Sequence, residues 1–187
     1  MHNNTRVEVV VADITTFPVA CIVNAANVGL RGGGGVDGAI HDAAGTNLLK
    51  ALQATYINGG KESGAYLTKA YAIYTADWIV HTVGPDLSSG KRDARKVKPN
   101  VALERAYRNT LEEAEGFTSI AFPTISTGIF AFPKEEACLI ALRTVKKYLD
   151  EHKGFMRVVF LVYDPKTKGP SEDAIYYNKH FPSFATL

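Results

Sequence analysis

Residues 23–41 read VNAANVGLRGGGGVDGAIH, and this stretch decides the fold class of the chain. It follows an apolar run at 20–23, passes through four glycines at 32–35, and continues into a short helical pattern at 36–44. A strand that turns through glycines directly into a helix is typical of α/β layered folds. Glycines let the backbone approach a ligand, and the free N–H groups at the start of the next helix favour an anion. The stretch therefore predicts an α/β fold with an anion site.

Apolar runs and helical patterns alternate along the rest of the chain. Further strands are predicted at 7–11, 78–83, 119–123 and 157–163, with a weaker candidate at 66–74. Helices with a regular apolar stripe are predicted at 47–56, 100–115 and 134–152. Several strands are apolar at nearly every position, as expected where helices cover both faces of a sheet. The 187 residues suit one well-buried core, so we expect a single domain over 1–187.

The composition limits the kinds of partner that this protein is expected to bind. A formal net charge of +2 is too small to indicate a nucleic-acid or membrane partner by itself. No apolar stretch approaches the ~20 residues that span a bilayer, and residues 1–6 do not resemble a signal peptide. We therefore expect a cytoplasmic monomer with no membrane partner.

One segment, 91–98, is locally basic through Lys91, Arg92, Arg95, Lys96 and Lys98. It lies between a predicted strand and a predicted helix, so a solvated loop is the expected role. The alternative is a surface for a phosphate-rich partner such as RNA, with an affinity that falls steeply with salt. The near-neutral net charge argues against a nucleic-acid partner.

The two cysteines, Cys21 and Cys138, lie in apolar patterns and are expected to be buried free thiols. The five histidines are scattered along the sequence. We therefore expect no disulfide, no metal site and no cofactor.

Three polar loops besides the glycine run follow predicted strands, where open α/β sheets bind their ligands. Asp13 directly follows the first strand and could accept a hydrogen bond from an exocyclic amine such as that of adenine, or form a turn or a helix cap. Asn24 and Asn27 bracket two alanines and could hold a ribose, or again form a turn. The loop 126–130 offers hydroxyls, backbone N–H groups and an aromatic ring that could clamp a diphosphate opposite the glycines, or be an ordinary loop.

The glycine run matches neither common nucleotide motif. No Gly-Lys-Ser/Thr follows it, and it lacks the spacing of the dinucleotide fingerprint. Taken together, the four loops predict a site for adenine, ribose, diphosphate and a second ribose.

The motifs at 23–27, 32–41, 79–85 and 122–128, in this order, closely resemble the macrodomain family. Within it they are similar to the hydrolase branch, whose glycine loop ends in Val-Asp-Gly-Ala-Ile-His. The resemblance implies a three-layer α/β/α sandwich around a mixed, roughly six-stranded sheet. It also implies binding of ADP-ribose and its esters, and hydrolysis of esters on the distal ribose, either in O-acetyl-ADP-ribose or in mono-ADP-ribosylated proteins at acidic side chains.

The resemblance also implies roles for individual residues. Asp13 would bind the adenine amine, with backbone contact from Ile14, while Tyr163 and Asp164 would flank the adenine. Asn27 would contact the distal ribose, against which Phe130 would pack. The diphosphate would be held by the residues of the two facing loops, Gly34, Gly35, Val36, Ser126, Thr127, Gly128, Ile129 and Phe130.

Asp37 and Asn27 are the expected catalytic residues. Ester hydrolysis needs an oriented water and removal of its proton, and a positioned carboxylate is typically worth ~10²–10⁴-fold. The helix dipole should lower the pKa of Asp37, so it either acts as the base or orients water while a substrate phosphate takes the proton. His41 is expected on the face of the helix and His81 in the core.

A non-catalytic reader that only binds ADP-ribose is the main alternative, and Asp37 favours the hydrolase. Three positions depart from the family pattern without touching the expected chemistry. They are Ala12, where glycine is usual, and Lys61 and Ser63, where cysteine and threonine are frequent.

Overall fold

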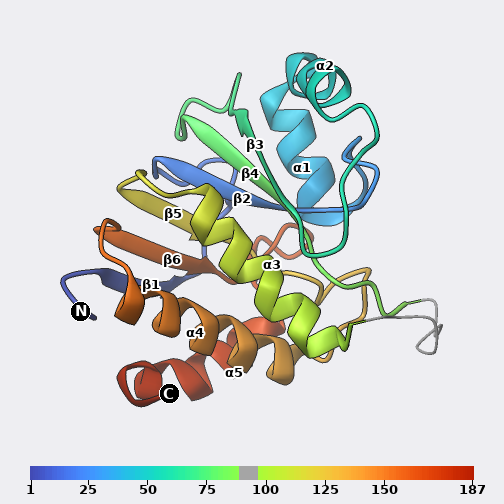
Figure 1. Ribbon diagram of the computed structural model, residues 1–187. Coiled ribbons are helices and arrows are strands. Elements are labelled where there is room, and N and C mark those ends of the chain that lie inside the picture. Colours follow the sequence, from blue (N-terminus) through green and yellow to red (C-terminus); the bar gives the residue numbers. More distant parts are fainter. Residues whose placement is uncertain (89–96) are drawn as a thin grey trace.

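Six strands form one mixed sheet in the order β1-β6-β5-β2-β4-β3 (Figure 1). They are β1 (Arg6–Val10), β2 (Cys21–Ala26), β3 (Ala65–Lys69), β4 (Trp78–Val83), β5 (Ser119–Phe122) and β6 (Arg157–Leu161). Neighbouring strands are parallel except β3, which pairs antiparallel with β4 at one edge. The computed structural model describes residues 1–88 and 97–187.

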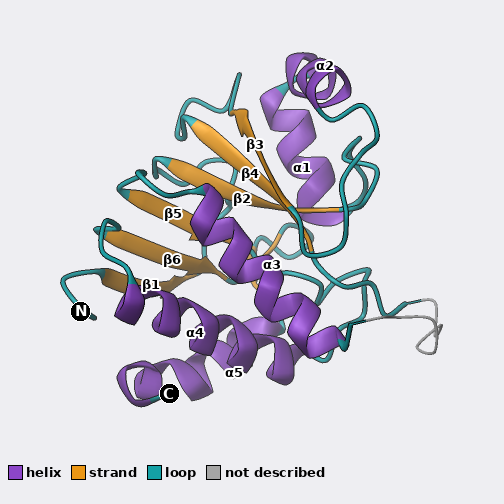
Figure 2. Ribbon diagram, viewed as in Figure 1, coloured by secondary structure: helices purple, strands orange, loops and turns teal. Residues whose placement is uncertain are grey.

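Helices cover both faces of this sheet (Figure 2). One face carries α1 (Gly35–Ala44) and α2 (Thr46–Thr55), and the other carries α3 (Pro99–Glu113), α4 (Lys134–Glu151) and α5 (Asp173–His180). The strands are apolar on both sides because each side meets a separate core. Cys21 and Val23 of β2 join the cluster under α3 and α4, whereas Ile22 and Ala26 join the cluster under α1. The predicted three-layer α/β/α sandwich is confirmed.

The sequence located most elements within a few residues and misjudged two segments. The weak strand predicted at 66–74 ends at Lys69, because Tyr71 turns the chain with a φ of 52° and Tyr74 is 95% exposed. The strand predicted at 157–163 stops at Leu161. Tyr163–Asp164 (β7) instead pairs with Gly169–Pro170 (β8) in a separate two-stranded ladder.

The C-terminal elements were not predicted. The helix α5 and the 3₁₀ helix η1 (Phe181–Thr186) pack on α4 through buried Tyr177 and Phe184. Within α5 only Asp173, Ala174 and Tyr177 are buried, which is too short a stripe to reveal a helix by its period.

Several expectations about single residues can be compared with the structure. Cys21 and Cys138 are buried free thiols, as predicted, and His81 is fully buried in β4.

Of the basic segment, Lys91, Arg92, Arg95 and Lys96 lie outside the described residues. Among the described residues, no helix is both long and apolar enough to cross a membrane.

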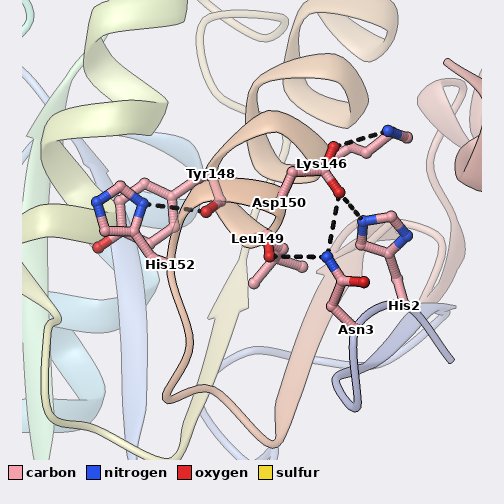
Figure 3. A network of polar contacts seen from close by, with 7 residues as sticks. All are labelled: His2, Asn3, Lys146, Tyr148, Leu149, Asp150 and His152. Atoms are coloured by element: carbon pink, nitrogen blue, oxygen red, sulfur yellow. Dashed lines mark hydrogen bonds and ion pairs between the residues drawn. The ribbon is translucent and has the colours of Figure 1, made fainter.

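The N-terminal residues are fastened to the end of α4 (Figure 3). His2 Nε2 lies 2.6 Å from Asp150 Oδ1, and Lys146 Nζ lies 2.8 Å from Asp150 Oδ2. The Asn3 amide donates to the Leu149 carbonyl and to Asp150 Oδ1, both at 3.2 Å. These contacts hold the start of β1 at the sheet edge, next to the last turn of α4.

Candidate functional site

A cavity of about 680 Å³ opens at the carboxyl ends of β1, β2, β5 and β6. The residues predicted as site residues are brought together around it, although they come from four separate loops. The lining includes all of them: Asp13, Ile14, Asn27, Gly34, Gly35, Val36, Asp37, Ser126, Thr127, Gly128, Ile129, Phe130, Tyr163 and Asp164. Their roles towards a ligand stay predictions.

Asp37 lies in the first turn of α1 and is only 4% exposed. Its Oδ1 accepts a hydrogen bond from Asn24 Nδ2 at 2.7 Å, and His41 Nε2 lies 3.5 Å from the same oxygen. Burial raises the pKa of Asp37. The hydrogen bond from Asn24 and the charge of His41 lower the same pKa, but by less than burial raises it. The expected lowering of this pKa by the helix dipole is therefore wrong, because removal of the carboxylate from water dominates.

Asn27 lies beside Asp37 across the glycine loop. Its Nδ2 donates to the Gly32 carbonyl at 3.1 Å and its Oδ1 accepts from the Gly29 N–H at 2.9 Å. A β-carbon added to Gly33 would lie 3.1 Å from both Asn27 Nδ2 and Asp37 Oδ2. The two polar atoms therefore flank the same backbone position, and only a glycine leaves the space between them open.

The glycine loop and the loop 126–130 face each other, as the sequence predicted. A β-carbon added to Gly34 would lie 3.1 Å from Ile129 Cδ1, so these residues approach across the opening. Ser126 has a φ of 67°, and its side chain and that of Thr127 are buried. Phe130 is half-buried, and its carbonyl accepts a hydrogen bond from the Leu87 N–H at 2.8 Å. Backbone hydrogen bonds from Leu87, Ala131 and Phe132 thus hold the loop, and Ile129 is exposed at the cavity.

The adenine-side candidates also serve as turn residues. Asp13 Oδ1 accepts from the Thr15 N–H at 2.9 Å and from Thr15 Oγ1 at 2.7 Å. Asp164 Oδ1 accepts from the Lys166 N–H at 2.9 Å. The turn role that the sequence left open for Asp13 is therefore present, in a residue that also lines the cavity.

The sequence reasoning missed the contribution of the C-terminal segment. Ser171, Glu172 and Asp173 line the cavity, together with Lys134, the first residue of α4. Asp173 is 5% exposed; burial raises its pKa, and a hydrogen bond from Thr127 and the charge of Lys134 act in the opposite direction. Lys134 also pairs with Glu172 at 3.1 Å. Residues 171–173 lie at the start of α5, whose pattern was too short to predict that helix, whereas Lys134 begins the predicted helix α4 but was not expected to line the site.

The comparisons with known proteins agree with this fold and cavity. The family model of the macro domain matches residues 23–141. An O-acetyl-ADP-ribose deacetylase of Klebsiella pneumoniae is 44% identical over 164 residues, which cover 86% of this chain and 90% of the relative. An O-acetyl-ADP-ribose deacetylase of Cronobacter sakazakii is 46% identical over 163 residues, 85% of this chain and 87% of the relative. The chain belongs to the macro domain family.

Solved structures show the same architecture. The Oceanobacillus iheyensis macrodomain with ADP superposes with a TM-score of 0.80 at 35% identity, covering 96% of this chain and 92% of that one. The Trypanosoma brucei macrodomain in complex with ADP-ribose superposes with a TM-score of 0.79 at 32% identity, covering 94% and 69% of the two chains.

Proposed function

We propose that this protein binds ADP-ribose in the cavity at the carboxyl ends of the strands and hydrolyses esters on the distal ribose. The substrates would be O-acetyl-ADP-ribose and proteins that carry mono-ADP-ribose on acidic side chains. Curated relatives named O-acetyl-ADP-ribose deacetylase and a related macrodomain in complex with ADP-ribose support this proposal. The observation that carries it is that Asp37 Oδ2 and Asn27 Nδ2 both lie 3.1 Å from the position of a β-carbon added to Gly33, in two residues that line the cavity.

In the proposed reaction, Asn27 holds the distal ribose and Asp37 orients a water. The water oxygen attacks the carbonyl carbon of the ester while its proton passes to the Asp37 carboxylate. The bond between that carbon and the ribose oxygen then breaks, and the ribose oxygen takes the proton back. The products are ADP-ribose and the free acid, and the carboxylate is restored.

The choice of base follows from the surroundings of Asp37. A buried carboxylate with a raised pKa takes up a proton more readily than an ordinary exposed one. This supports Asp37 as the base, rather than a phosphate of the substrate with Asp37 only orienting the water.

The remaining lining residues hold the nucleotide in this proposal. The two facing loops would clamp the diphosphate with their N–H groups, while Asp13 and Ile14 bind the adenine and Tyr163 and Asp164 flank it. Residues 1–187 would act as one macrodomain, a cytoplasmic monomer. The pairing of β1 with β6 supports one domain, because it joins the N-terminal strand to the last strand of the main sheet.

The test is hydrolysis of O-acetyl-ADP-ribose and of a protein mono-ADP-ribosylated on glutamate, with calorimetry on free ADP-ribose alongside. Asp37→Asn should lower turnover by at least ~10²-fold, the lower end of what a positioned base supplies, with ADP-ribose binding retained. Asp42→Asn is the matched control, because Asp42 is an exposed acid on the same helix. Binding without turnover in the wild type would leave a reader, and absence of binding would refute the proposal.

A further inference from the structure

A buried chain of polar side chains runs from Asp37 in α1 through β2 and β4 to β3. Asn24 Nδ2 lies 2.7 Å from Asp37 Oδ1 and 3.0 Å from His81 Nδ1, and His81 Nε2 lies 2.9 Å from Thr68 Oγ1. Asn24 and His81 are fully buried and lie directly opposite each other in the parallel pair β2–β4. None of the three residues behind Asp37 lines the cavity, so they cannot touch a ligand there.

The chemistry of the partners fixes the direction of each hydrogen bond. An ionised Asp37 only accepts, so it selects the NH₂ end of the Asn24 amide. The second hydrogen of that NH₂ points to His81 Nδ1, which must therefore be unprotonated. Burial lowers the pKa of His81 to about 3, so the ring is neutral and carries its one proton on Nε2, facing Thr68 Oγ1.

This arrangement gives the two Asp37 oxygens different tasks. Oδ1 is bound by Asn24, whereas Oδ2 lies on the Gly33 side next to Asn27. Within the described residues, Asn24 Oδ1 is buried with no hydrogen-bond partner. A fully buried amide that leaves its own oxygen unpaired costs stability, which argues that its NH₂ group is retained for the contact with Asp37.

We propose that Asn24 is a positioning residue for Asp37, oriented in turn by His81 and Thr68 through one fixed histidine tautomer. The chain directs Oδ2 towards the reacting water and favours the ionised form of the carboxylate. The effect of this chain on catalysis rests on the proposed function, whereas the contacts among Asp37, Asn24, His81 and Thr68 do not depend on that function.

The pH dependence of Asp37 involves few groups. Among the described residues, His41 from its own helix and the neutral Asn24 from β2 contact the Asp37 carboxylate, and His81 from β4 lies behind Asn24. The rings of His41 and His81 are 6.3 Å apart. A lost donor at Oδ1 removes a contact that stabilises the ionised form, so the pKa of Asp37 should rise and the acidic limb of the activity profile should move to higher pH.

The kinetic test uses Asn24→Leu, together with the pair Thr68→Val and Thr68→Ser. Thr68→Val keeps the shape of the side chain and removes only the hydroxyl that binds His81 Nε2, whereas Thr68→Ser retains it. In Asn24→Leu we expect kcat to fall on the order of 10²-fold, because the base is no longer held in position. In Thr68→Val we expect kcat to fall about fivefold, as for the loss of one hydrogen bond. KM should change little, the acidic limb should move to higher pH, and Thr68→Ser should restore both kcat and pH profile.

Thr144→Val is the matched control for the loss of a largely buried threonine hydroxyl. Thr144 lies on α4 and donates to the Ile140 carbonyl at 2.7 Å, away from the cavity. It should leave kcat and the pH profile unchanged. Thermal melting of every variant identifies any that fails to fold, and Thr68→Val alone decides the outcome if Asn24→Leu is one of them.

A second measurement keeps this inference separate from the proposed function. Carbon-13 NMR of the Asp37 carboxyl group, assigned with Asp37→Asn, reports its titration whether or not an ester is hydrolysed. Nitrogen-15 NMR of His81 should show the proton on Nε2 in the wild type and a mixture of tautomers in Thr68→Val. An unchanged Asp37 titration and an unchanged His81 tautomer in folded Thr68→Val would overturn the positioning role, even if the enzyme is active.

Discussion

Gly34 and Ile129, from two loops far apart in the sequence, meet across the opening of the cavity, where a β-carbon at Gly34 would lie 3.1 Å from Ile129 Cδ1. Gly34 is the residue before α1, and Ile129 is 70% exposed. At this point the cavity stays open because Gly34 has no side chain opposite the exposed side chain of Ile129.

Gly34→Ala should weaken ADP-ribose binding, and Ile129→Ala should restore part of the loss. A β-carbon within 3.4 Å of a neighbour forces that neighbour to move, which here narrows the space proposed for the diphosphate. Ile129 Cδ1 is the end of an exposed side chain that can shift by a few tenths of an ångström, so the loss should be at most about 1 kcal/mol, or roughly fivefold in Kd. Calorimetry on both single variants and the double variant measures the coupling, and strictly additive losses would contradict it.

Asp37→Asn should raise the thermal stability of the protein at neutral pH. Burial raises the pKa of Asp37 in the folded state, so folding is favoured at low pH and loses stability as pH rises through the window between the unfolded and folded values. Asparagine retains an oxygen that can accept from Asn24 without the buried charge. We expect Tm to rise by a few degrees at pH 7, at about 2–4 °C per kcal/mol for this chain length.

The gain should disappear at acidic pH, where Asp37 is protonated in both states. Differential scanning fluorimetry between pH 3.5 and pH 8, with Asp42→Asn as control, tests the sign. A constant gain at every pH would mean that the effect comes from packing and not from the charge.

Asp150→Asn should reduce stability slightly at neutral pH and not at all in acid. The hydrogen bond from Lys146 and that from His2 lower the pKa of Asp150, so its contribution is present above the unfolded value and lost as pH falls. Asp150 is 41% exposed, so the contribution belongs in the range of surface ion pairs, about 0.2–1 kcal/mol. Urea denaturation at pH 7 and at pH 3 measures both cases, and turnover should stay at the wild-type level.

Asp173→Ala should weaken ADP-ribose binding more than Asp173→Asn does. Asp173 is a buried acid that lines the cavity together with the loop 126–130, and burial raises its pKa. Alanine leaves unfilled the buried space that the carboxyl group occupies, whereas asparagine keeps the shape of the side chain and removes only its charge. Calorimetry on both variants tests this, and equal losses would show that the negative charge of Asp173, and not the shape of its side chain, supports binding.

The sequence predicted the elements whose signals are local. Asn27 and Asp37 were predicted at the site from the turn that leads from β2 through the glycines into α1. A glycine run and the start of a helix can both be recognised from consecutive residues. The loop 126–130 was recognised for the same reason, since it lies between a strand and a proline that begins the next helix.

The rest depended on contacts between distant segments. Asp173 was missed because α5 buries too few residues to show a period. The pKa of Asp37 was predicted in the wrong direction, because burial is set by packing and the helix dipole was the only effect that the sequence displays. His81 was correctly placed in the core, but its partners Asn24 and Thr68 come from two other strands, whose registers no local pattern specifies.

The parallel pairing of β1 with β6 has a consequence for how the molecule is made. Arg6 of β1 lies beside Arg157 of β6. During synthesis on the ribosome, β1 therefore cannot pair with β6 until residues 157–161 have emerged. Contacts between such distant residues slow folding, since a long loop must close before they form. Asp13 lies shortly after β1, and residues 171–173, which also line the cavity, follow β6 in the sequence. Nascent chains should therefore acquire nucleotide binding only after both β6 and the start of α5 have left the exit tunnel.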